Sequence, residues 1–438
     1  MPRPSRQDSA RFRVRRAARS AIALLAALGA PLAHADDAAA PPVYSAPTAR
    51  TGMSGALGAY PFTRESSGTS WQPDNAEHVG AHEMNGDWML MGHALLNGVY
   101  DWQQGPRGDT DTFVSGMFMG SAERTVSGAD TLRLRAMLSP DPLMGKSGLP
   151  LLLASGETAN GTTPLVDRQH PHDLFMELSA SYAHPLTDVD GLFIYGGLPG
   201  EPAFGPPAFM HRPSTSESPE PPITHHWLDS THVTFGVVTV GWVHDTWKLE
   251  ASRFRGREPD QFRYNIETGR LDSDAVRLSW NPTAALALQV SWAHVVSPEQ
   301  LFPAENQQKE SASALYTVPF AAAGSWSTTL AWGRRSSEHG ALDAYALEST
   351  VRLDADWSVF ARLEREQNDE LALIDGAPGP VHAVGKASAG VVRYFRVASR
   401  ARIGAGGLYS LNAVPHGLEP LYGSDPRGAM LFLRLVVD

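Results

Sequence analysis

The side chains of this chain that could bind a metal ion are methionines and histidines, since the sequence contains no cysteine. Several of them recur at alternate positions: Met89, Met91 and His93; then Met117 and Met119; and Met137 further on. In an extended strand, alternate residues face the same side, so each run presents its sulfur and imidazole groups together. Thioether and imidazole ligands together suit a soft ion such as Cu(I) better than Mg²⁺ or Ca²⁺. The alternative is that flexible methionines simply fill an irregular interior.

A second set combines histidines with a carboxylate: His170, His172, Asp173, His225, His226 and His232. In an extended chain His170 and His172 point the same way, as a chelating pair could. Imidazole and carboxylate ligands fit Zn²⁺ or Cu²⁺, so copper or zinc is the candidate metal. The alternative is that these residues form hydrogen bonds that hold a folded loop against its surroundings.

Motifs of soluble hydrolases are weakly represented. The string from His170 to Asp173 is similar to the HxHxD metal motif of such enzymes, but no strand–helix context surrounds it. The sequence has no GxSxG motif. A serine–histidine hydrolase stays open as a third hypothesis because spacing in sequence cannot reveal a triad.

The elements that must position these residues are short segments of alternating hydrophobicity. Residues 285–296 are an example, with Leu286, Val290 and Trp292 on one parity and Gln289 and Ser291 on the other. One face therefore suits lipid and the other a polar interior, which is the pattern of a transmembrane β-strand. Sixteen such strands are predicted, at residues 86–102, 110–125, 129–139, 172–185, 190–198, 230–243, 246–257, 272–281, 284–296, 308–319, 325–335, 343–354, 357–367, 385–397, 400–411 and 427–437.

The connections between these strands alternate in length. Short turns separate the predicted strands at one end, and longer loops are expected at 103–109, 140–171, 199–229, 258–271, 297–307, 336–342, 368–384 and 412–426. Short periplasmic turns and longer external loops are usual in outer-membrane barrels. We therefore predict an all-β fold, a closed antiparallel transmembrane β-barrel of about 16 strands, with both termini on the periplasmic side.

The strand parities place the methionines inside this barrel. His93, Met119 and Met137 are expected to lie level on three adjacent strands, and Met430 shares the inward parity of the last strand. Nine charged residues are also expected to face inward: Glu177, Lys248, Glu250, Arg277, Glu348, Arg352, Arg362, Glu364 and Arg434. They could pair and seal the lumen or line a wet pore, and the sequence leaves both open.

The N-terminal region predicts export. Residues 1–35 are typical of a signal peptide, with a basic start, an apolar stretch too short to span a bilayer and an Ala33-His34-Ala35 cleavage site. Residues 36–85, rich in Pro, Ala and Gly, are expected to be a flexible periplasmic segment, and 86–438 to form the barrel. Removal of the signal would change the net charge from −11 to −17, which disfavours nucleic acid as a partner.

Two stretches support this prediction by resemblance. Residues 422–438 resemble the closing strand of Gram-negative outer-membrane proteins, although this chain ends in Asp438 and not in an aromatic residue. Residues 167–178 are similar to a recurring string in uncharacterised outer-membrane proteins. The resemblance to porin-like barrels implies the cell outer membrane as the location, with lipid, lipopolysaccharide and the barrel insertion machinery as partners. It implies no activity.

Three functions are consistent with these observations. The first is a pore or transport protein for small solutes or ions. The second is a copper or zinc protein for metal binding, export or tolerance that uses the inward Met and His residues and the external His loops. The third is the outer-membrane hydrolase.

Overall fold

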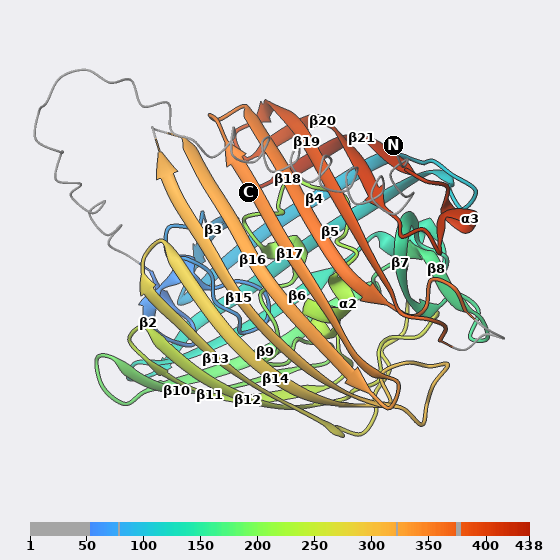
Figure 1. The fold of residues 1–438 in the computed structure, drawn as a ribbon. Helices are drawn as coiled ribbons and strands as arrows, with labels where there is room; N and C mark the ends of the chain where they lie inside the picture. Colours follow the sequence, from blue (N-terminus) through green and yellow to red (C-terminus); the bar gives the residue numbers. More distant parts are fainter. Residues whose placement is uncertain (1–52, 78, 321–322, 374–377) are drawn as a thin grey trace, which may run out of the picture. The chain divides into compact units, whose positions relative to one another are not determined.

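The computed structural model describes residues 53–77, 79–320, 323–373 and 378–438. The predicted signal peptide and residues 36–52 lie outside this part of the chain. From Ser54 onward the chain forms one compact unit, which contains the barrel and everything folded within it (Figure 1). No helix among the described residues is long and apolar enough to cross a membrane.

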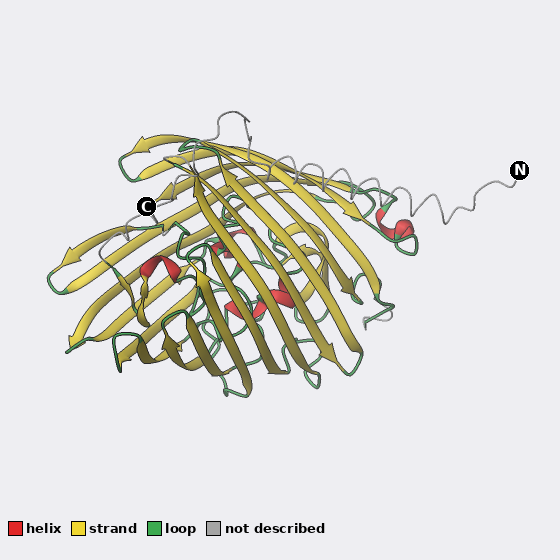
Figure 2. Cartoon of the chain, turned by 60° about the vertical axis from the view of Figure 1, so that its left-hand side comes forward, coloured by secondary structure: helices red, strands yellow, loops and turns green. Residues whose placement is uncertain are grey.

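Sixteen antiparallel strands close into a barrel, as predicted (Figures 1 and 2). They are β4 Trp88–Gln103, β5 Thr110–Ser127, β6 Asp130–Leu138, β9 Phe175–Pro185, β10 Asp190–Gly197, β11 Val237–His244, β12 Trp247–Phe254, β13 Ser273–Thr283, β14 Leu286–Val296, β15 Asn306–Phe320, β16 Gly324–Ser337, β17 Gly340–Arg352, β18 Trp357–Asn368, β19 His382–Ala398, β20 Ala401–Ala413 and β21 Arg427–Val437. The last strand pairs with the first, from Gly428 opposite Gln103 to Val437 opposite Ala94. A short strand, β3 Ala81–Asn85, continues the sheet on β4 beyond that pairing.

The parity of each strand sets which side chains face lipid. On β21, Leu431 and Leu433 are 65% and 63% exposed, whereas Phe432 and Arg434 between and beside them are buried. The same alternation recurs around the wall, which leaves a broad apolar outer face that a soluble protein would not expose to water. Aromatic residues such as the stacked pair Trp247 and Trp280 also lie on this outer face. The barrel is therefore built for the outer membrane.

Most predicted strand ends agree with the structure to within three residues, and two differences change how the chain is connected. The strand expected at 230–243 begins only at Val237, because residues 230–233 are almost all buried on both parities and include the short helix η4 Ser230–His232. The loop expected at 336–342 is a tight turn, because β16 and β17 pair as far as Ser337 and Gly340.

Most of the described part of the segment expected to be flexible is folded inside the barrel, and its last residues form β3 of the sheet. Residues 54–77, here called the N-terminal plug, contain β1 Ser54–Gly55, β2 Gly58–Pro61 and η1 Phe62–Arg64. Trp71 is buried, and Asn281 of β13 donates a 2.8 Å hydrogen bond to the Gln72 carbonyl. The prediction of a flexible segment is wrong here because these apolar and polar groups find partners on the inner wall. The plug lies at the periplasmic end, where Asn75 contacts the carbonyls of Ala284 and Thr317.

Two more segments enter the lumen. Residues 199–236, here called the inward loop, carry η3 Phe209–His211, α2 His225–Leu228 and η4, and the short helices are enclosed by the strands in Figure 2. A hairpin of β7 Leu149–Thr158 and β8 Pro164–Gln169 fills the external half. Its Leu151, Leu152 and Leu153 pack with Leu371 and Tyr422 from other external loops. The remaining short helices are η2 Asp141–Met144 and α3 Glu419–Tyr422.

Candidate functional site

Most of the charged side chains that face the barrel interior are joined in ion pairs. All nine charged residues predicted on the inward face are paired: Glu177 with Arg135, Lys248 and Arg277 with Glu250, Glu348 with Arg212, Arg352 with Glu77, Arg362 with Glu364 and Glu220, and Arg434 with Glu217. Arg212, Glu217 and Glu220 belong to the inward loop. The loop therefore crosses from the β10 side and is held to the opposite wall by its charges, so of the two alternatives for the inward charges, pairing is the one observed.

Arg212 is the centre of the most buried of these networks. Its guanidinium contacts Glu348 of β17 and Asp229 of the loop at 2.7 Å each, and all three side chains are at most 2% exposed. Burial would raise the pKa of Asp229, but the charge of Arg212 outweighs it and holds that pKa well below its usual range. Asp229 is thus an anion that depends on Arg212.

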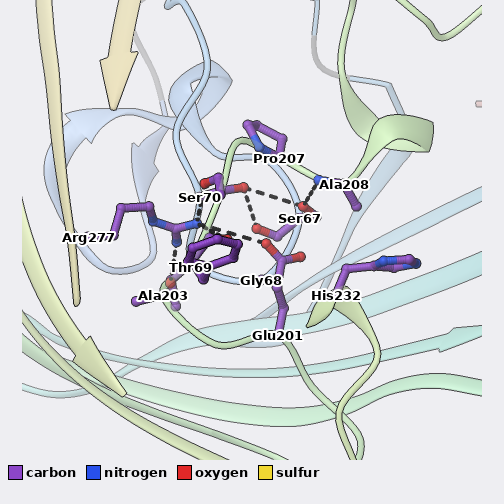
Figure 3. A network of polar contacts seen from close by, with 12 residues as sticks. Ser67, Gly68, Thr69, Ser70, Glu201, Ala203, Pro207, Ala208, His232 and Arg277 are labelled. Atoms are coloured by element: carbon purple, nitrogen blue, oxygen red, sulfur yellow. Dashed lines mark hydrogen bonds and ion pairs between the residues drawn. The ribbon is translucent and has the colours of Figure 1, made fainter. Parts of the chain in front are cut away.

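A second polar network joins the plug to the inward loop (Figure 3). The Ser67 hydroxyl accepts a 2.8 Å hydrogen bond from the Ala208 amide, and Arg277 of β13 donates to the Thr69 hydroxyl at 3.0 Å. Glu201 lies 4.0 Å from the same guanidinium, and burial raises its pKa to about 8. The plug, loop and wall thus form one connected structure.

One cavity of about 570 Å³ is left in the periplasmic half. It extends to the rim at Ala355, Ser399 and Asp438. Its wall brings together thioethers and imidazoles from β4, β5 and the inward loop: Met91, His93, Met117, Met119, Met210 and His211. Nδ1 of His93 and Nε2 of His211 are buried and have no hydrogen-bond partner among the described residues. We call these six residues the Met/His cavity.

The predicted alignment of the methionines is confirmed. His93 is the register partner of Met119, and Met119 is the partner of Met137. Met137 does not line the cavity but packs behind it, against Met117 and Met176. Sequence parity would have placed Met176 on the lipid face. A register shift between Met137 and Leu138 at the β6–β9 pairing turns it inward.

Two of the predicted methionines lie elsewhere. Met89 pairs with Glu123, toward the periplasmic end of β4, and does not line the cavity. Met430 is opposite Asp101 and is buried among Val99, Phe113 and Leu408, far up the strand from His93. Met210 and His211 enter from the inward loop, whose path into the lumen the strand pattern does not reveal.

The second predicted set is brought together inside the barrel, not on its external surface. His225, His226 and His232 of the inward loop pack beside His170 and His172, with ring centroids 5.1 Å apart for His225 and His232 and 5.7 Å for His170 and His226. Asp173 is not part of this cluster, since it pairs with Arg263. Among the described residues, no three His, Asp or Glu side chains converge as a preformed metal-binding group.

Three histidines of this cluster are held in the neutral form by burial. Burial lowers the pKa of His170, His226 and His232 well below the usual range. Burial, followed by the charge of Arg135, lowers the pKa of His211 to about 3, and His93 and His172 contribute in the same direction. The neutral imidazole is the form that binds metal ions.

Comparisons with known proteins give a likeness of fold. No protein-family model and no curated protein matches the chain. OmpF of Salmonella typhi, solved in a complex with daunomycin, is 11% identical with a TM-score of 0.51 over 81% of this chain and 100% of its own. Two further structures have lower TM-scores. An anion-selective porin from Comamonas acidovorans is 10% identical with a TM-score of 0.46 over 80% of this chain and 99% of its own. OprB of Pseudomonas putida is 9% identical with a TM-score of 0.47 over 80% of this chain and 94% of its own. With sixteen closed strands, a lipid-facing exterior and a fold like that of OmpF, the chain is a porin-like β-barrel of the outer membrane.

Proposed function

We propose that this barrel handles a soft transition-metal ion, copper in its Cu(I) state, and passes it along the methionines and histidines of its interior. The observation that carries the proposal is the Met/His cavity. Six thioether or imidazole side chains from three separate elements line one space, and two of the imidazole nitrogens there have no hydrogen-bond partner within the described part of the chain. Several weak sites in a row suit conduction, because an ion must leave as well as enter.

A general pore for small solutes is the competing function. The sixteen-stranded wall is wide enough for an aqueous channel. The plug, the inward loop and the β7–β8 hairpin occupy most of that width, which favours a small ion over a larger solute. The hydrolase hypothesis gains no support from these rings. Among the described residues, the ring of His172 contacts Asp141 and His232, that of His225 contacts Asp229, and that of His232 contacts the Asp229 carbonyl, and none contacts a serine. That lipopolysaccharide and the barrel insertion machinery are partners of this chain stays a prediction.

Replacing Met91 and Met119 by leucine tests the metal proposal. Leucine keeps a similar volume and apolarity, so the barrel is expected to fold. The two cavity thioethers are lost, so Cu(I) affinity is expected to fall by about tenfold or more, which corresponds to about 1.4 kcal/mol. The measurement is competition between the purified full-length barrel and a coloured Cu(I) chelator without oxygen.

The matched control replaces Met144 and Met430, which pack in the apolar cluster of the external half. This double variant removes the same number of sulfur atoms and should bind Cu(I) as the parent does. If Met91→Leu with Met119→Leu binds Cu(I) as tightly as this control, the cavity methionines are packing residues and the proposal fails.

A further inference from the structure

Two imidazoles in the histidine cluster face each other at an unusual distance. Nε2 of His172 and Nε2 of His232 lie 3.1 Å apart; His232 is buried, and the side chain of His172 is 11% exposed. His172 follows the β7–β8 hairpin, and His232 ends η4 of the inward loop. The contact therefore joins segments that are 60 residues apart in sequence.

The hydrogen bonds of the opposite ring nitrogens fix the protons. Nδ1 of His232 lies 2.7 Å from the carbonyl oxygen of Asp229, and Nδ1 of His172 lies 2.7 Å from a carboxylate oxygen of Asp141. Both of these oxygens accept, so each Nδ1 carries a proton and donates it. In the neutral rings both Nε2 atoms then carry lone pairs directed at each other. Such an arrangement requires a cation between them, either a shared proton or a metal ion.

We propose that His172 and His232 form a two-imidazole site for one divalent ion of borderline softness, Zn²⁺ or Cu²⁺. With metal–nitrogen bonds of about 2.0–2.1 Å, nitrogens this far apart subtend an angle of about 100° at the ion. That angle fits two neighbouring positions of a tetrahedral or tetragonal site. Metal-binding histidines usually donate the other ring N–H to a carboxylate or carbonyl, as both rings do here.

The charges around the pair favour a cation. The only ion pair that the described residues give Asp141 is the one to His172, so its negative charge is otherwise balanced only by hydrogen bonds such as that from the Gly116 amide at 3.2 Å. The carboxylate of Asp229 is shared between Arg212 and His225. The two-imidazole site deepens the proposed function. The binding of an ion there does not depend on that function, but the biological role of the ion does.

Asparagine at position 172 or 232 removes the metal-binding Nε2 atom and keeps a donor for the hydrogen bond that Nδ1 makes. The side-chain amide of asparagine can donate from near the position of Nδ1, so His172→Asn and His232→Asn retain the bonds to Asp141 and to the Asp229 carbonyl. Neither variant has an Nε2 atom. The control is His244→Asn on the outer face, where Nδ1 likewise lies 2.8 Å from a carboxylate, Asp190, but no second imidazole stands opposite.

The test is electron paramagnetic resonance of stoichiometric Cu²⁺ on the full-length barrel that carries Met91→Leu and Met119→Leu. In this parent we expect hyperfine coupling of Cu²⁺ to two imidazole nitrogens. Each Asn variant should show one nitrogen fewer and a Cu²⁺ affinity lowered by about tenfold or more. The control should match the parent in both. If the parent shows fewer than two nitrogens, or the Asn variants match the control, the pair shares a proton and the site proposal is wrong. Should an Asn variant fail to assemble, the nitrogen count of the parent decides. Cu(I) binding to the intact Met/His cavity is measured separately, so either proposal can fail alone.

Discussion

Replacement of residues 206–228 by a short Gly/Ser link is expected to convert the barrel into an open channel. This segment carries Arg212, Glu217 and Glu220, which hold the inward loop to the far wall. The two ends can be joined easily, because Gly205 lies directly against Leu228. The barrel should persist, since wall charges such as Glu348 and Lys386 would then be hydrated by lumen water and not buried without partners.

Single-channel current in planar bilayers measures this effect. The full-length chain is expected to give little steady current. The shortened chain is expected to give a stable ohmic conductance, because only the plug and the β7–β8 hairpin then remain inside a wall that is wide enough for an aqueous channel. Folding of the shortened chain is checked by its β-sheet circular dichroism. A folded shortened barrel that conducts no better than the full-length chain would show that the inward loop does not close the lumen.

Substitution of Arg212 by alanine is expected to cause the largest loss of stability from a single residue. Glu348 and Asp229 would be left as buried carboxylates without their partner, at a cost of about 3–5 kcal/mol. Equilibrium unfolding in denaturant, followed by tryptophan fluorescence in detergent micelles, gives the change. The combined variant Arg212→Met, Glu348→Gln and Asp229→Asn removes the charges together and should recover most of that loss.

The comparison for this prediction is an ion pair on the outside of the wall. Arg253 and Asp274 contact each other but their side chains are 47% and 50% exposed. Arg253→Ala should therefore change the free energy of unfolding by no more than about 1 kcal/mol. Equal effects at Arg212 and Arg253 would contradict the view that buried pairs hold the inward loop in place.

The wall of the barrel could be predicted from the sequence because a period of two determines both the face and the register of each strand. The strand predicted at 427–437 is β21 to the residue, and the level of His93, Met119 and Met137 followed from counting along the loop at 103–109 and the short turn between the next two strands. A shift of one residue in the pairing register of a strand would move its lipid-facing leucines into the lumen, so the hydrophobic pattern allows one register only.

The interior could not be predicted in the same way. The inward loop is held by contacts such as Arg212 with Glu348, 136 residues apart, and no local pattern records such a pairing. Its many prolines are equally typical of an external loop. The plug has a Gly/Ser-rich sequence that suggests a linker. Its large aromatic residues Tyr60 and Trp71, which are buried in the structure, were the sequence feature that could have indicated packing against the inner wall. The site residues Met210 and His211 were out of reach because their position depends on the loop.

The central claim is that this barrel selects a soft metal ion and excludes larger solutes. Parallel flux into vesicles that contain the full-length chain tests it most directly, with a Cu(I)-sensitive dye inside one set and radiolabelled arabinose outside another. Cu(I) is expected to enter faster than into protein-free vesicles, while arabinose enters no faster than into them. Arabinose entry through the full-length chain, or Cu(I) entry no faster than in protein-free vesicles, would contradict the account.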